Sequence, residues 1–303
     1  MTSNPELEQK KSLIEQFRET RNRTLELVKT LEKDDFVIQT AFFMSPPKWH
    51  IGHVSWIYEA IISKLDKNYE FYSKEFSDYL NSYYQQFGTP QDKGLRGISS
   101  RPTVDQIFQY FNTINQRVEK FIESKSLNEN EIKLITMGFH HECQHQELLV
   151  YDLQHLLAEQ YRPTTKKEIP KHNNIEKKSV HIKGGIYTMG YNGENYCYDI
   201  ELPEHKVYLN DYKIDTFPIT NQQFMEFVKD GGYENYKHWL SDGWEKVKAN
   251  KWNAPMYWEK IEGEWNVRDF LGINKINPNQ PVCHVSYYEA DAYCKWAGKR
   301  LPT

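Results

Sequence analysis

The chain has 303 residues and a formal net charge of -4, with 38 basic and 42 acidic side chains spread along its length. Because the lysines and arginines form no stripe, the composition argues against a nucleic-acid or anionic-membrane partner and favours small molecules. No run approaches the roughly 18 apolar residues of a membrane span, and the polar residues 1–11 lack the apolar stretch of a signal peptide. We therefore expect a cytoplasmic protein, whose four cysteines, without C-x-x-C spacing, are reduced thiols.

The first half of the chain has the pattern of long amphipathic helices. Four runs of apolar residues at helical spacing occur there, each preceded by a helix-start signal: Asn4-Pro5, Pro46-Pro47, Thr103 with Gln106, and Ser126 with Glu129. The last run extends to about residue 157. Four long helices with one lengthy connection between the second and third predict a four-helix bundle over residues 1–161.

The second half has a different pattern. Residues 162–178 are rich in Pro, Thr, Asn and Lys and are expected to be a linker, because they cannot bury enough apolar surface to fold alone. Residues 179–303 form short segments separated by Gly, Asn, Asp and Pro, which is typical of an α+β domain. Short helices are expected at Thr220–Val228, with Phe224 and Phe227 facing inward, and at Tyr287–Ala297, capped by Ser286 and Glu289.

Two histidines of the fourth predicted helix, His141 and His145, lie four residues apart, so that both imidazoles project from one face of the helix. This spacing lets a helix hold one metal ion. Glu142, Gln144 and Glu147 are candidates to orient these rings through the second ring nitrogen. The same spacing also arises by chance with structural or solvated histidines, so it does not establish a metal site by itself.

A third ligand would come from a facing helix. His50 and His53, near the start of the second predicted helix, are both candidates, because residues three apart also share a face. Three protein ligands leave open positions on a metal, as catalytic sites do. Three imidazoles suit zinc as well as iron, so the residues alone leave the metal open.

Several segments together resemble the ergothioneine-biosynthesis sulfoxide synthases. In the first half they are residues 45–53 (SPPKWHIGH), Asn81-Ser82-Tyr83-Tyr84, Arg96-Gly97, Ser100-Arg101-Pro102-Thr103 and residues 141–149 (HECQHQELL). In the second half, segments similar to the family's sulfatase-modifying-factor domain are Gly184-Gly185, Met189-Gly190, Thr220-Asn221, residues 230–233 (DGGY), 239–244 (WLSDGW) and 281–290 (PVCHVSYYEA). The resemblance covers nearly the whole chain.

The resemblance implies a DinB-like four-helix bundle followed by a C-type-lectin-like domain of the formylglycine-generating-enzyme type, with the active site between them. It implies a non-haem iron(II) ion held by His53, His141 and His145, which decides against His50. The implied enzyme joins hercynine (trimethylhistidine), at its imidazole C2 carbon, to cysteine or γ-glutamylcysteine. It consumes O2 and gives a sulfoxide.

The resemblance also implies roles for residues around the metal. Tyr83 and Tyr84 are assigned as proton donor and orienting group, and Gln144 as a contact to the substrate imidazole. Arg96 and Arg101 are assigned to a substrate carboxylate, which a guanidinium binds through two parallel hydrogen bonds. From the residues alone, a packed pair of loop tyrosines and two surface arginines would be the simpler interpretation.

The chain departs from the family pattern at two points. Cys143 replaces the commoner Gln between the two histidines, on another face of the helix. The family continues beyond the segment that ends here at Thr303, so we expect a second domain that is incomplete at its C-terminal end. Three other functions stay open: a DinB-type stress or thiol-transfer protein with zinc or nickel, a selenium-inserting relative (a selenoneine synthase), and a lectin-like binding module.

Overall fold

The computed structural model describes residues 5–82, 92–158, 178–193, 196–269 and 272–303. The chain divides into two compact units, residues 1–160 with the stretch 194–196, and the remainder of 161–303. The predicted linker, 162–178, lies almost wholly outside the described residues, so the predicted domain boundaries stay a prediction. Within the described residues, every helix is too short or too polar to cross a lipid bilayer.

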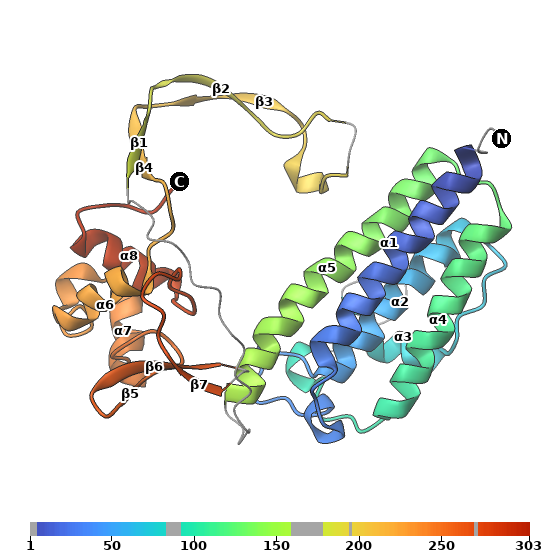
Figure 1. Ribbon diagram of the computed structural model, residues 1–303, viewed down its shortest axis with the longest axis horizontal. Coiled ribbons are helices and arrows are strands. Elements are labelled where there is room, and N and C mark those ends of the chain that lie inside the picture. The colour runs from blue at the N-terminus through green and yellow to red at the C-terminus, as the bar shows by residue number, and fades with distance from the viewer. Residues whose placement is uncertain (1–4, 83–91, 159–177, 194–195, 270–271) are drawn as a thin grey trace. The chain divides into compact units, whose positions relative to one another are not determined.

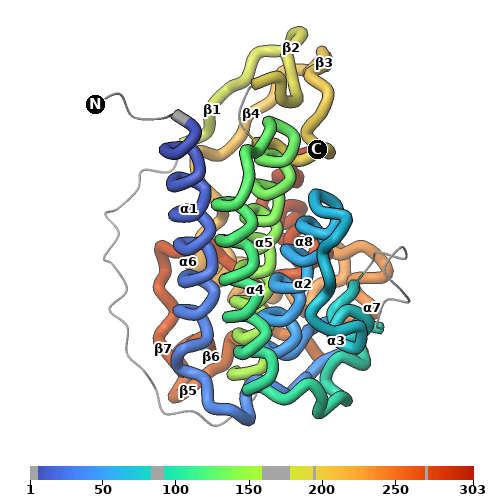
Figure 2. Tube along the Cα trace, turned by 90° about the vertical axis from the view of Figure 1, so that its right-hand side faces the viewer, coloured from blue at the N-terminus to red at the C-terminus, as the bar shows by residue number. Residues whose placement is uncertain are grey.

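The first unit is a four-helix bundle, which confirms the predicted fold of this half (Figure 1). Its long helices are α1 (Pro5–Val28), α2 (Pro47–Leu65), α4 (Val104–Ser124) and α5 (Glu129–Ala158). Shorter pieces lie in the connections: η1 (Lys33–Phe36), α3 (Lys74–Leu80) and η3 (Lys93–Leu95). α2 packs against α4 and α5, and α1 packs against the same two helices, so the four surround one core (Figure 2).

Two of the four predicted helix starts, those of α2 and α4, are confirmed. α1 begins at Pro5, and its predicted cap Asn4 lies outside the described residues. α2 begins at Pro47, and α4 is opened by the reciprocal hydrogen bonds of Thr103 and Gln106. The predicted box at the start of α5, Ser126 with Glu129, is wrong. The reciprocal pair there is Asn128 and Glu131, at 2.9 and 3.1 Å. The two candidate boxes overlap in sequence, and the Ser126 hydroxyl instead bonds the carboxylate of Glu6 on α1.

Aliphatic and aromatic side chains fill the core of the bundle. The most deeply buried include Phe17, Trp56, Tyr110, Phe111, Ile114 and Leu156. Burying one such side chain stabilises the fold by about 1.5–3 kcal/mol relative to leaving it in water. α2 is buried along nearly its whole length, from Pro47 to Ile62. Any polar group on this helix therefore needs a partner inside the protein.

The second unit combines small antiparallel sheets with short helices, as an α+β domain should. β1 (Ser179–Ile182) pairs with β4 (Tyr212–Asp215), and β2 (Gly185–Met189) pairs with β3 (His205–Leu209). A three-stranded sheet has the order β5 (Trp258–Ile261), β6 (Glu264–Asp269), β7 (Gly272–Lys275). The helices are η4 (Asp199–Glu201), α6 (Asn221–Lys229), η5 (Tyr236–His238), α7 (Ser241–Asn250) and α8 (Tyr287–Trp296).

The two predicted helices of this unit are confirmed. Thr220 caps α6 and Ser286 caps α8, each with a capping box, and Phe224 and Phe227 lie in the core of this unit. Helix α7 was not anticipated. Its N-cap is Leu240, whose side chain makes no capping hydrogen bond, so the usual start signal is missing.

Candidate metal centre

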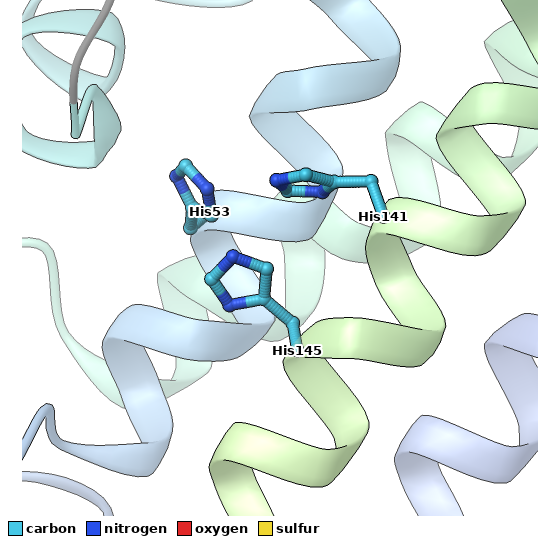
Figure 3. A group of neighbouring side chains, drawn as sticks. All are labelled: His53, His141 and His145. Carbon is cyan, nitrogen blue, oxygen red and sulfur yellow. The ribbon is translucent and has the colours of Figure 1, made fainter. Parts of the chain in front are cut away.

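Three histidine side chains converge from two helices of the bundle (Figure 3). α5 carries His141 and His145 one turn apart, and α2, which packs against it, carries His53. One ring nitrogen of each residue lies within 4.8 Å of one from each of the others, and the ring centroids are 4.5 to 5.3 Å apart. In the part of the chain that the structure describes, this is the group of side chains with the geometry to hold a metal ion.

Packing near the start of α2 fixes the His53 ring. The indole of Trp49, one turn earlier, stacks on the imidazole, with centroids 4.5 Å apart and ring planes 11° apart. The guanidinium of Arg96 lies 3.4 Å from the centroid of the Trp49 ring, within reach of a cation–π contact. The metal-facing ring is thus supported by an aromatic residue, which is in turn supported by a buried cation.

Hydrogen bonding leaves one nitrogen of His53 available for a metal. Its Nδ1 donates to the backbone carbonyl of Leu80 at 2.6 Å, so Nε2 carries the lone pair. Nε2 is buried and has no hydrogen-bond partner among the described residues. Leaving such a group unsatisfied costs free energy, and a bound cation would remove that cost. The residues present therefore fit a metal ion.

The three rings are neutral at pH 7. Burial is the largest cause: it lowers the pKa of His141 to about 4 and holds those of His53 and His145 well below the usual value. The neighbouring imidazoles lower the pKa of His53 and His145 further, because a positive charge on one ring disfavours a positive charge on the next. Neutral imidazoles are the form that binds metals.

His50, the other candidate on α2, is not the third member of the group. Both of its ring nitrogens have partners, His145 Nδ1 and Asp152 Oδ2. Burial lowers the pKa of His50, although the hydrogen bond to the Asp152 carboxylate acts in the opposite direction. The structure thus brings together the three histidines that the family resemblance selected.

A cavity of about 100 Å³ lies beside the histidines. Its lining combines cationic, hydroxyl and imidazole groups: Ser45, Trp49, His50, Ser82, Lys93, Arg96, His141, His145, Leu148 and Asp152. A larger cavity, about 350 Å³, lies within the second unit and is lined by no histidine. The smaller cavity is the better candidate for chemistry, because the metal-binding donors are there.

The other predicted site residues are placed as follows. Tyr83 and Tyr84 lie outside the described residues. Arg96 is buried, lines the cavity and donates to the Ser45 hydroxyl at 2.9 Å. Arg101 is exposed and donates to the carbonyl of its neighbour Ser100, and Gln144 is exposed on α5. Neither Arg101 nor Gln144 is among the residues that line the cavity.

One sequence prediction at the centre is wrong. Glu142 does not orient a histidine, because it lies on another face of α5 and bonds Arg21 and Thr24 of α1. The residue that sequence reasoning missed is Asp152, buried next to His50. A signal was available, since Asp152 lies seven residues after His145, two turns further along the same face of the helix.

Comparison with known proteins divides the chain in the same way. Residues 16–149 match the DinB superfamily, and residues 165–303 match the sulfatase-modifying factor enzyme 1-like domain. A hercynine oxygenase from Mycolicibacterium smegmatis is 33% identical over 168 residues, which are 54% of this chain and 38% of that protein. One from Mycolicibacterium thermoresistibile is 27% identical over 300 residues, 96% of this chain and 64% of that protein.

The second half has relatives of its own. The formylglycine-generating enzyme of Bos taurus is 32% identical over 138 residues, 42% of this chain and 37% of that protein. The chain spans less than two thirds of the length of each of these relatives. The similarity to the hercynine oxygenase of Mycolicibacterium thermoresistibile nevertheless runs through both units.

Proposed function

Since the chain belongs to the family in which a DinB domain is followed by a sulfatase-modifying-factor domain and which includes the hercynine oxygenases, we propose that it forms a carbon–sulfur bond oxidatively on hercynine. The observation that carries the proposal is the convergence of His53, His141 and His145. The metal is iron(II), O2 is the co-substrate, and a cysteine-type thiol is the second substrate.

The donor set supports this choice of metal site. Three neutral imidazoles, without a carboxylate or thiolate among them, do not compensate the positive charge of the ion. Three ligands also leave coordination positions open for the substrates. An iron(II) ion bound there would supply the redox chemistry with O2 that no amino-acid side chain provides. The protein contributes binding, orientation and the exclusion of water. Burial of His53 and the small neighbouring cavity serve that last purpose.

The proposed reaction balances with one thiol, one hercynine and one O2. The imidazole C2–H bond and the S–H bond break, and a carbon–sulfur bond forms. One oxygen atom becomes the sulfoxide oxygen, and the other leaves as water together with the two hydrogens. O2 is the only oxidant that the reaction needs. Cysteine and γ-glutamylcysteine both satisfy this balance.

The cavity residues have a role in substrate binding. Arg96 and Lys93 put two cationic groups beside the histidines, which suits the carboxylates of both amino-acid substrates. We assign Tyr83 and Tyr84 as proton donor and orienting group. Gln144 and Arg101 complete the proposed substrate contacts. Because both are exposed in the structure, we expect them to act at the rim of the site, with smaller effects than Arg96.

The test is O2 consumption by the 303-residue chain, loaded anaerobically with iron(II), on addition of hercynine with cysteine or with γ-glutamylcysteine. Mass spectrometry should find the sulfoxide, and His141→Ala should abolish it. A chain that folds and holds iron but consumes no O2 with either thiol would overturn the proposal. Zinc bound as isolated, without O2 chemistry, would favour a thiol-transfer or stress protein. Product only with a selenium donor would favour the selenium-inserting relative.

A further inference from the structure

A row of buried polar groups ends on one of the three metal-site histidines. His50 Nδ1 lies 3.1 Å from His145 Nδ1, and His50 Nε2 lies 2.9 Å from Asp152 Oδ2. The backbone N–H of Ser45 donates to the same Asp152 oxygen at 2.9 Å. His50 and Asp152 are 3% and 2% exposed, so these contacts are largely shielded from bulk solvent. The row therefore runs from a carboxylate through one imidazole to a second.

Counting protons along the row leaves one arrangement compatible with metal binding. Asp152 Oδ2 is an acceptor for Ser45, so the proton between it and His50 sits on His50 Nε2. A neutral His50 then has a bare Nδ1, which must accept a proton from His145 Nδ1. His145 is left with its lone pair on Nε2, the nitrogen away from His50.

The opposite arrangement fails. If His50 Nδ1 carried the proton, His145 Nδ1 would have to accept it. A neutral His145 would then hold its own proton on Nε2 and could not bind a metal through that nitrogen. The contacts around His50 thus determine whether His145 can be a ligand at all.

We propose that His50 and Asp152 are positioning residues, which hold His145 as the tautomer protonated on Nδ1 and direct its Nε2 toward the metal. This inference rests on the metal site of the proposed function. A carboxylate or carbonyl behind a metal-binding histidine typically changes metal affinity by about 10- to 100-fold. His53 receives its equivalent from the Leu80 carbonyl, a backbone group, whereas the partners of His145 are side chains that substitution can remove.

The first measurement is zinc affinity, by competition of the 303-residue chain with a chromophoric chelator. His50→Phe keeps the ring shape and removes both nitrogens, and it should weaken zinc binding by about 10- to 100-fold. His155→Phe is the matched control: His155 is buried like His50, but it lies on α5 beside Phe43, and this variant should bind zinc as the wild type does. His50→Asn, whose amide oxygen can accept from His145 Nδ1, should recover part of the affinity.

The second measurement is the tautomer of His145 in the zinc-free protein, from ¹⁵N-histidine NMR with His145→Gln for assignment. The wild type should be protonated on Nδ1, and His50→Phe should give a mixture of tautomers. A merely structural role for His50 would leave the tautomer unchanged.

The outcomes separate this inference from the function on which it rests. A wild type that binds no zinc would overturn the metal site and the inference together. Zinc binding that is equally tight in His50→Phe would overturn the positioning role alone. A zinc-free wild type protonated on Nε2 of His145 would do the same, and this result does not depend on the folding of His50→Phe.

Discussion

On one face of α5, His141 and His145 turn toward α2, whereas on the adjacent face Glu142 and Gln146 turn toward α1. The second network is closed. Glu142 accepts from Arg21 at 3.2 Å and from the Thr24 hydroxyl at 2.6 Å. The Gln146 amide donates to Thr24 and to a backbone carbonyl of α1. Every polar group named there has its partner inside the protein.

The first face is open by comparison. His53 Nε2 and His141 Nδ1 are buried without a hydrogen-bond partner among the described residues. Buried polar groups are normally satisfied, so an unsatisfied pair of imidazoles beside a cavity marks a place where a ligand completes the network. The comparison teaches that a structural network differs from a binding site less in residue type than in closure, by which we mean that every buried polar group has a partner inside the protein. Three experiments test it, each aimed at one face.

The largest effect is expected on the closed face. Arg21→Met leaves the fully buried Glu142 carboxylate without its cation, and it should lower the free energy of unfolding of the zinc-free protein by about 3–5 kcal/mol. The guanidinium also bonds Asn115 and Ser55, both at 2.7 Å, and these contacts are lost too. Urea denaturation at pH 7 measures the change.

The double variant Arg21→Met/Glu142→Leu is the control for that prediction. It removes both charges, and a large part of the lost stability should return, because an apolar pair of similar volume replaces the ion pair. A single variant within about 1 kcal/mol of the wild type would mean that Glu142 does not depend on Arg21. The closed face would then contribute less to the free energy of unfolding of the bundle than its hydrogen bonds imply.

The next effect concerns the open face and a bound metal. Free zinc at about one hundred times its dissociation constant should raise the free energy of unfolding of the wild type by about 2.7 kcal/mol, because the ion binds the folded state. His141→Ala should abolish this increase and change the zinc-free stability little, since His141 is partly exposed and its Nδ1 has no hydrogen bond to lose among the described residues. Thermal unfolding with and without zinc measures both quantities. An equal increase in wild type and variant would place the zinc elsewhere.

The sequence predicted the open face better than the closed one. Spacing alone put His141 and His145 on one face, and the resemblance chose His53 over His50. Both inferences agree with the convergence of the rings. The role of Glu142 was misjudged because a residue next to a ligand in sequence lies about 100° away around a helix. Only the packing of α1 against α5 reveals its partner Arg21.

In the fold, too, the sequence predicted features that depend on near neighbours and missed those that depend on distant contacts. Capping boxes located α4 and α8, and the spacing of Phe224 and Phe227 after Thr220 located α6, because these signals depend on residues only three or four positions apart. Helix α7 has no such signal at Leu240, and the start of α5 offered two overlapping ones. The spacing of seven residues places Asp152 on the helix face of His145, but its contact with His50, 102 positions away in the chain, is encoded by no local pattern.

The smallest effect returns to the closed face at Gln146. Gln146→Met keeps the length of the side chain and removes two donor contacts, to the Thr20 carbonyl at 2.9 Å and to the Thr24 hydroxyl at 3.0 Å. A neutral hydrogen bond contributes about 1 kcal/mol net, and methionine restores apolar contact, so the free energy of unfolding should fall by about 1 kcal/mol. Zinc affinity should stay at the wild-type value, because the hydrogen bonds of the Gln146 side chain among the described residues go to α1. A loss of zinc affinity without loss of stability would show that the two faces of α5 are coupled, and closure would no longer separate them.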